Sequence, residues 1–268
     1  MISVKKKFKI LFTLDLEKTS LSRHGLIPLQ VTGKRGRTNG KGKKIHYMKY
    51  VFVDFEMNAI RSKFKEARAV CRSEIIEIGA VMLNDTYEEI AEFRQYVKPE
   101  YNEISKKYED LTGVTNDKVK DAPAFFPAMV QFRDWCIAAS SGDSFCIYAW
   151  SDTDLRQIQR EMQLKKVDSD QFSILTKEWV DFQKQFCDIL GLEHRISLEV
   201  AVGSISKKFE GTMHDALWDA RNTAVIFALS KNEDEFERTM RPIIDMIRPS
   251  GPMTFTMGDL FKGFDLKS

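Results

Sequence analysis

The sequence contains no long apolar run, and this absence excludes a membrane-spanning helix. A helix that crosses a bilayer needs about 20 consecutive apolar residues, and no stretch of the 268-residue chain approaches that length. The apolar patch Ile10-Leu11-Phe12 is also too short for the core of a signal peptide, and Asp15 and Glu17 follow it closely. We therefore expect a cytoplasmic protein without a membrane partner.

Cysteine is scarce, with four residues in the whole chain: Cys71, Cys136, Cys146 and Cys187. No two of them have the CxxC spacing of a zinc or redox motif, and each has apolar neighbours. The pattern argues against a disulfide framework and against a zinc site. We expect reduced, mostly buried thiols.

Charge is divided unevenly along the chain, although the net charge is only +2. Residues 1–49 carry 13 Lys and Arg against 2 Asp and Glu, whereas the remainder carries 28 against 37. A basic arm of net charge +11 thus precedes an acidic body of net charge −9.

The basic arm covers residues 1–46 and includes a glycine-rich cationic stretch at 33–44. It has no apolar periodicity, so we expect it to be disordered on its own. Three interpretations stay open. It could be an arm that follows the phosphates of a nucleic acid, a solvated tail of little consequence, or an extension upstream of a true start at Met48.

Five segments have the composition of β-strands. The β-branched and aromatic run 49–55 comes first, and 74–83 and 89–97 follow it with short polar turns between them. Such short connections predict an antiparallel meander. The continuous apolar run 144–149 fits a buried parallel strand, and 179–182 is a fifth candidate.

Helical periodicity begins after the third strand, where apolar residues recur every three or four positions in 125–136. Further helices are predicted at 154–162, 183–190, 197–205, 215–229 and 233–247. This order predicts an α/β domain over residues 47–250, with a mixed five-stranded sheet and helices on both faces. It is typical of the ribonuclease-H-like fold. Residues 251–268 form a C-terminal tail for which the pattern predicts no element.

Asp54 and Glu56 lie at the end of the first strand, two positions apart. Alternation along a strand puts both carboxylates on one face of the sheet and Phe55 on the other. Two neighbouring carboxylates repel each other, so a buried pair requires protons or a metal ion. By itself, however, this motif is more often an exposed acidic pair on a strand.

A second pair of acids, Asp152 and Asp154, lies where the strand 144–149 gives way to a helix. Either could be only a helix N-cap. Asp152 suits the cap, whereas Asp154 precedes the helical pair Leu155 and Ile158 and suits an inward-facing ligand. We therefore predict Asp154 rather than Asp152 at the site.

His214 and Asp219 flank the start of the helix predicted at 215–229. Positions five apart are displaced around a helix axis, so His214 is expected on the loop side of the boundary. From there it can lean over a metal ion held by Asp219. Alone, His214 is more often a surface or capping residue. Asp215 suits the helix start, where a carboxylate complements the helix dipole.

The weight of these motifs comes from their combination. The acids and the histidine occur in the order DxE, D and Hx4D, each at a strand end or helix start around one sheet. Carboxylate oxygens are the ligands that Mg²⁺ and Mn²⁺ prefer. Two such ions stabilise the attacking and leaving oxygens of a phosphodiester displacement, and a histidine can take a proton from water near neutral pH. The pattern thus predicts two-metal phosphodiester cleavage.

The three motifs resemble those of the DEDDh branch of the DnaQ-like exonuclease superfamily. The segments around them are similar to the Eri-type 3′–5′ exonucleases and to the bacterial KapD-like exonucleases. These segments are EIIEIGAV at 74–81, YVKP at 96–99, LTGVT at 111–115 and DAPAFFP at 121–127. The resemblance covers roughly residues 48–230.

The resemblance implies a role for each residue of the motifs. Asp54 would bridge two divalent ions, Mg²⁺ or Mn²⁺. Glu56 and Asp219 would complete the catalytic metal site, and Asp154 would support the second ion. His214 would be the general base that activates the attacking water.

The resemblance also implies a group of substrate-binding residues. Leu111 and Thr112 match a segment near the 3′ nucleotide, where Leu111 would wedge against the terminal base. The backbone around Met57 would meet the 3′ hydroxyl. Ordinary core packing explains Leu111 equally well.

We therefore predict a metal-dependent 3′–5′ exonuclease that acts on RNA or single-stranded DNA with a free 3′ end. The alternatives are a catalytically silent nucleic-acid-binding module and a regulatory protein on the same fold. The complete set of carboxylates favours the enzyme, because a silent module has no need of repelling charges. If substrate is also captured away from the active site, the basic arm is the candidate, since the acidic body would repel a nucleic acid.

Overall fold

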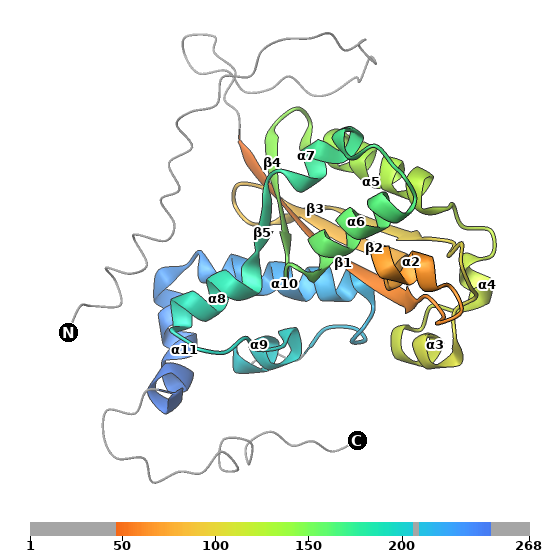
Figure 1. Ribbon diagram of the computed structural model, residues 1–268. Helices are drawn as coiled ribbons and strands as arrows, with labels where there is room; N and C mark the ends of the chain where they lie inside the picture. Colours follow the sequence, from red (N-terminus) through yellow and green to blue (C-terminus); the bar gives the residue numbers. More distant parts are fainter. Residues whose placement is uncertain (1–46, 206–208, 248–268) are drawn as a thin grey trace, which may run out of the picture.

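The computed structural model describes residues 47–205 and 209–247, with side chains up to residue 240. Its centre is a five-stranded sheet in the order β3-β2-β1-β4-β5 (Figure 1). The strands are β1 (Met48–Ala59), β2 (Ser73–Leu83), β3 (Glu89–Tyr96), β4 (Ser144–Ala149) and β5 (Trp179–Asp181). The first three form an antiparallel meander, and β4 and β5 run parallel to β1. The predicted mixed sheet is therefore confirmed.

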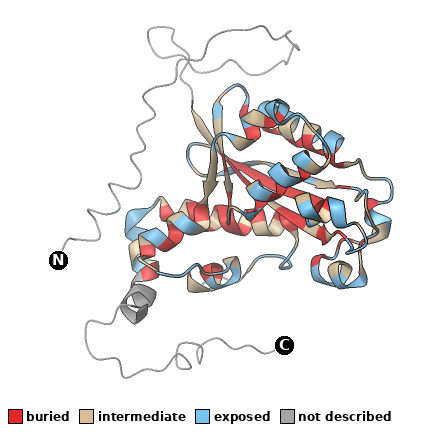
Figure 2. Ribbon diagram, viewed as in Figure 1, coloured by how far each residue is buried: buried red, intermediate tan, exposed pale blue. Residues whose placement is uncertain are grey.

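Helices cover both faces of this sheet, as predicted. On one side lie α5 (Phe125–Ser140), α6 (Thr153–Leu164), η1 (Ser169–Phe172) and α7 (Ser173–Thr176). On the other side lie α8 (Phe182–Leu190), α9 (Leu198–Ser204), α10 (Ala216–Ser230) and α11 (Glu233–Ile247). Alternation along β1 divides the core, because Val51, Val53 and Phe55 pack toward α5 and α6 while Phe52 packs toward α10. Figure 2 shows the buried residues concentrated on the central strands and on α10.

Local capping explains where several helices begin and end. The side chains of Asp181, Ser197 and Asp215 accept backbone N–H bonds at the starts of α8, α9 and α10. Gly191 ends α8 in the left-handed conformation that a residue without Cβ adopts freely. The long helices were predicted within a few residues of these bounds.

The short helices were not predicted. They are α2 (Lys65–Val70), α3 (Lys106–Thr112), α4 (Asn116–Val119), η1 and α7. One or two turns are too few for apolar periodicity to emerge, and tertiary contacts hold such segments in place. For α3 and α4, those contacts are a small core of Ile76, Ile104, Val114 and Val119.

The sheet opens at the C-terminal end of β1. β4 pairs with β1 only as far as Tyr148 opposite Phe52, so the rest of β1 continues without a strand on that side. The register between β1 and β2 also shifts between Glu56 and Met57, a bulge of the kind common beside functional sites. Side chains from other elements can therefore approach β1 beyond Phe52.

The sequence also predicted the state of the cysteines, the absence of a membrane-spanning helix and two terminal segments. All four cysteines are free, three of them buried and Cys146 partly so, as expected. Within the described ranges, no helix is long and apolar enough to cross a membrane. The proposed arm, residues 1–46, and the proposed tail, residues 251–268, lie outside the described residues.

Candidate active site

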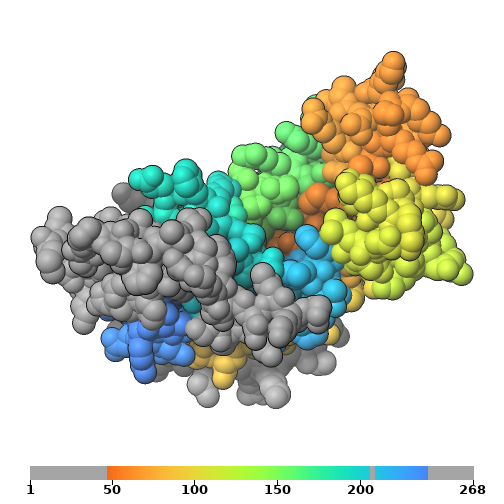
Figure 3. Space-filling view, turned by 90° about the horizontal axis from the view of Figure 1, so that it is seen from below, coloured from red at the N-terminus to blue at the C-terminus, as the bar shows by residue number. Residues whose placement is uncertain are grey.

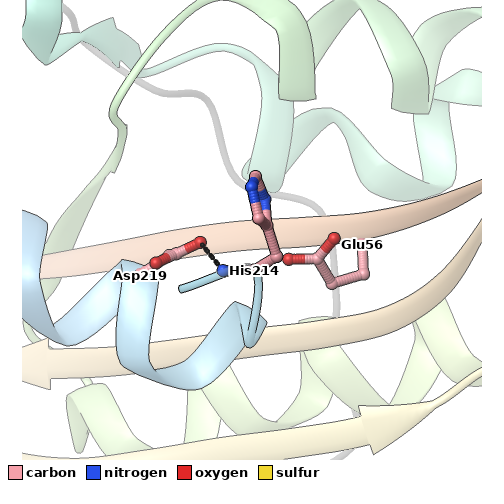
Figure 4. A group of neighbouring side chains, drawn as sticks. All are labelled: Glu56, His214 and Asp219. Atoms are coloured by element: carbon pink, nitrogen blue, oxygen red, sulfur yellow. Dashed lines mark hydrogen bonds between the residues drawn. The ribbon is translucent and has the colours of Figure 1, made fainter. Parts of the chain in front are cut away.

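Residues far apart in the sequence meet where β1 leaves β4. Glu56 comes from β1, Asp219 from the first turn of α10, and His214 from the loop before that helix. Each offers one ligand atom, and these atoms all lie within 4.8 Å of one another (Figure 4). Asp54 lies on the same face of β1 as Glu56, and its electrostatic neighbours are Asp154, Glu56 and Asp219.

Asp154 reaches this cluster from the opposite face of the sheet. It lies in the first turn of α6 and is buried, and its Oδ1 accepts the backbone N–H of Phe55 at 3.3 Å. That N–H is available because β4 no longer pairs with β1 at this point. The bond fixes the carboxylate beside Asp54.

Asp152 takes a different place. It occupies the N-cap position of α6 as expected, but its carboxylate makes no capping hydrogen bond. Instead it pairs with Arg156 one turn along the helix. Of the two candidate acids, the structure thus brings Asp154 to the cluster.

His214 lies just before the N-cap residue of α10, on the loop side of the boundary as predicted. Its φ of 60° is in the left-handed region, which is uncommon for residues other than glycine. Its backbone N–H donates to Asp219 Oδ2 at 3.2 Å (Figure 4). The side chain of Asn222 makes two hydrogen bonds to the backbone of Glu210 and so ties this loop to α10. The residue His214 is exposed, so its imidazole is accessible to solvent.

Burial and mutual repulsion make these carboxylates hard to ionise. Burial, helped by Asp219 and Glu77, raises the pKa of Glu56 to about 9. Burial likewise raises the pKa values of Asp154 and Asp219 to about 7. The pKa of Asp54 also rises, because this carboxylate is largely removed from water and faces the charges of Asp154 and Glu56. A cluster of oxygen donors that repel one another fits divalent cations of the Mg²⁺ type, which would offset that repulsion.

One acid that borders the site, Glu77, was not predicted from the sequence. Glu77 lies directly opposite Glu56 on β2 and is 1% exposed. Burial raises its pKa to about 7, although Arg94 Nε lies 3.5 Å away and opposes the rise. Arg94 also pairs with Asp215, and the Glu77 carboxylate accepts the backbone N–H of Ala216. Glu77 therefore links β2 to the start of α10. The available signal was an acid within the otherwise apolar run 74–83.

Gly79 lets α10 approach the sheet. It pairs with Asp54 across β1 and β2, and a Cβ at this position would lie 2.1 Å from Leu217 N and 2.2 Å from Ala216 C. Only glycine leaves room for backbone at that distance. The close contact brings Asp219 and His214 to the carboxylates of β1.

The predicted substrate-binding residues Met57, Leu111 and Thr112 lie in different environments. Leu111, at the end of α3, is 44% exposed and is not a core residue. Thr112 is buried, and its hydroxyl donates to Tyr108 O and accepts from Val114 N. Met57 is partly buried against the core on the α5 side. Of these three side chains, that of Leu111 is the most exposed and can contact a ligand.

Fold and site together define a nuclease of the ribonuclease-H-like class, with its acids at the open end of the sheet. The chain belongs to the exonuclease family, whose model, described as Exonuclease (RNase_T), matches residues 51–227. This match spans the sheet, the acidic cluster and α10.

Individual relatives agree with the family assignment. The chain is 27% identical over 207 residues to 3′-5′ exoribonuclease 1 of Rattus norvegicus, covering 69% of this chain and 59% of the rat protein. It is 28% identical over 229 residues to ERI1 exoribonuclease 2 of Mus musculus, covering 76% of this chain and 32% of that protein. The chain therefore spans less than two thirds of the length of either relative.

A solved structure supports the fold. The nuclease domain of 3′hExo, a DEDDh family member bound to rAMP, superimposes with a TM-score of 0.59 at 24% identity. The match covers 70% of this chain and 92% of that domain.

Proposed function

We propose that this chain is a divalent-metal-dependent 3′–5′ exonuclease that hydrolyses the terminal phosphodiester bond of single-stranded RNA. The observation that carries the proposal is the convergence of Asp54, Glu56, Asp154, Asp219 and His214 at one open end of the sheet. Family membership supports the exonuclease reaction. The relatives named as 3′-5′ exoribonucleases support both the direction of attack and RNA as the substrate.

Each residue of the cluster has a proposed role. Asp54, Glu56, Asp154 and Asp219 would hold two ions, Mg²⁺ or Mn²⁺. When bound, such ions supply Lewis-acid activation of water and stabilise the attacking and leaving oxygens. The exposed imidazole of His214 accepts the proton of the attacking water at a ring nitrogen.

The residues around the cluster would place the 3′ end. The exposed side chain of Leu111 is proposed to wedge against the terminal base. The backbone at Met57 would meet the 3′ hydroxyl, and Thr112 would hold the α3 turn through its two hydrogen bonds. Single-stranded DNA remains a second candidate substrate, because discrimination depends on contacts to the 2′-OH.

The test is the shortening of a 5′-labelled oligonucleotide in Mg²⁺ or Mn²⁺. We expect stepwise loss of 3′ nucleotides that is abolished by EDTA and by Asp154→Asn. Asp152→Asn is the matched control, because it makes the same chemical change two residues away at a partly exposed carboxylate outside the cluster. Matched RNA and DNA substrates, run side by side, measure the preference.

Two outcomes would contradict the proposal. If the wild-type protein binds the oligonucleotide but never shortens it with either metal, the chain is a silent nucleic-acid-binding module. If Asp152→Asn and Asp154→Asn lose activity equally, the assignment of Asp154 fails.

A further inference from the structure

A short basic segment joins β1 to β2 and contrasts with the acidic body around it. The segment runs from Ile60 to Arg72 and contains one acid, Glu66. Its five basic residues are Arg61, Lys63, Lys65, Arg68 and Arg72. All but the half-buried Arg68 are exposed. The segment is thus a concentrated positive charge on a protein whose residues beyond 49 have a net charge of −9.

These cations have no carboxylate partners among the side chains described, those of residues 47–205 and 209–240. None of the five forms an ion pair there, whereas many other described Lys and Arg residues do, such as Lys165 and Arg221. The guanidinium of Arg68 is used locally, since it donates to Ile60 O. The charged groups of the other four residues are exposed to solvent and available to an anionic ligand.

Aromatic rings accompany the cations. An open groove of about 600 Å³ is lined by Lys63, Phe64, Lys65, Glu66, Ala67, Tyr101 and Leu164. The rings of Phe64 and Tyr101 meet edge to face at 5.5 Å, and Lys63 Nζ lies 4.9 Å from the Phe64 ring centre. Cations interleaved with partly exposed rings are the combination that single-stranded nucleic acids require: phosphates meet the cations and bases stack on the rings.

Hydrogen bonds hold both walls of the groove in place. Ile60 N donates to Arg72 O at 2.9 Å and closes the segment at its base. On the other wall, Tyr101 N donates to Glu74 Oε2 at 3.0 Å. Glu74 is fully buried and lies 3.1 Å from Lys165 Nζ. Both walls are therefore formed before any ligand arrives.

The groove lies within reach of a substrate bound at the acids. Arg61 follows Glu56 by five residues along β1 and the turn after it, a span of about 16 Å at about 3.3 Å per extended residue. Figure 3 shows the segment in orange as a projection on the rim of the hollow whose floor is β1. A strand whose 3′ end occupies the cluster would reach this rim within a few nucleotides.

We propose that the groove formed by Lys63, Phe64, Lys65 and Tyr101 binds the single-stranded part of the substrate upstream of its 3′ end. This inference rests on the proposed function and extends it with a second substrate contact. Lys63 and Lys65 meet phosphates, and a base packs against the partly exposed rings of Phe64 and Tyr101. Arg61 and Arg72 add to the local positive potential. The groove compensates for the negative charge of the body and favours substrates long enough to reach it.

The test measures binding without turnover. Fluorescence anisotropy in EDTA gives the Kd of a 5′-fluorescein oligouridylate of 12 nucleotides and of one of 3 nucleotides for the full chain. The ratio of the Kd of the 3-nucleotide oligomer to that of the 12-nucleotide oligomer measures the affinity gained with length. We expect Lys63→Ala/Lys65→Ala to reduce this ratio by about 10-fold. The slope of log Kd against log salt should fall by about 1.4. Tyr101→Leu keeps an apolar side chain in the wall but removes the ring. This substitution should weaken the binding of the 12-nucleotide oligomer by at least about 5-fold.

The matched control is Lys177→Ala/Lys184→Ala, which removes two exposed cations near β5. It should leave the length dependence unchanged, with thermal melts confirming that every variant is folded. The proposal is overturned if Lys63→Ala/Lys65→Ala retains the wild-type gain with length, or if the control loses as much. Oligonucleotide shortening in Mg²⁺ is a separate measurement. If the oligonucleotide binds through these residues but is never shortened, the exonuclease proposal is refuted and the groove proposal stands.

Discussion

Glu56 illustrates, at the scale of one residue, what the site costs the folded chain. Burial, Asp219 and Glu77 raise its pKa from 4.5 to about 9. The folded protein therefore holds a proton that the unfolded chain releases at neutral pH. The stability that comes from this proton is complete below pH 4.5 and is lost as the pH rises toward 9.

We predict that Glu56→Gln removes this loss. Without metal, in EDTA, the Tm of the wild-type protein should fall as the pH rises from about 5 to 9, and that of the variant should fall less, with each kcal/mol equal to roughly 2–4 °C. Mg²⁺ should raise the wild-type Tm at pH 8 and have a smaller effect on the variant, because bound ligand stabilises the folded state. Parallel pH profiles for the two proteins would show that Glu56 ionises freely.

His214 has two possible roles in the geometry, base or metal ligand, because its ring nitrogens lie within reach of the same point as Glu56 and Asp219. We predict that His214→Asn lowers kcat by about 10²–10⁴-fold while metal affinity measured by calorimetry stays close to the wild-type value. Asparagine is the better choice than alanine, because it tolerates the φ of 60° at this position. A parallel loss of metal affinity would identify His214 as a ligand instead.

At the scale of elements, the start of α10 decides whether the cluster exists. The start of α10 packs directly against β2 at Gly79. Glu77 on β2 also accepts the Ala216 N–H. Asp219 follows within the first turn, so a shift of this end moves a carboxylate and the histidine loop together.

We predict that Gly79→Ala lowers kcat by about 100-fold even well below its Tm, because a Cβ 2.1 Å from Leu217 N must displace the helix start. Phe186→Leu is the control. It weakens the core between α8 and α11 and should lower Tm by several degrees with activity retained at low temperature. Equal loss of activity in both variants at about 10 °C would mean that Gly79 acts through stability alone.

Elements differ in how far the sequence predicted them. Strands and long helices were predicted because burial imposes a period of two or 3.6 residues on their own side chains. The helices α2 and α3 were missed, although α3 carries Leu111 and α2 carries Lys65. Both are held by contacts to other elements, such as the small core under α3, that no local period records.

At the scale of the whole molecule, charge separates the chain into a basic arm and an acidic body. The body has a net charge of −9 beyond residue 49, so a polyanionic substrate approaches it against repulsion. We propose that the groove beside β1 compensates locally for this charge, and the basic arm of residues 1–46 is the candidate for a second compensation.

We predict that deleting residues 1–46 weakens oligonucleotide binding and reduces the salt slope by about 0.7 for each phosphate that the arm neutralises in the full-length protein. A chain of full length in which all Lys and Arg residues of 1–46 are replaced by Gln separates charge from length. If the arm binds phosphates, the two proteins should behave alike in anisotropy titrations. An unchanged slope after deletion would assign the arm no role in binding.

Local spacing in the sequence predicted which residue types form the site, but not how these residues are arranged in space. DxE on a strand and Hx4D at a helix start predicted Asp54, Glu56, His214 and Asp219, because alternation and helix geometry act over a few residues. The sequence also favoured Asp154 over Asp152, but only the tertiary structure contains the contact that places Asp154, the Phe55 N–H that β4 leaves unpaired. The tertiary structure alone brought Glu77 and Gly79 against the start of α10. Distances between residues more than a hundred positions apart follow from how layers pack, and no local pattern contains them.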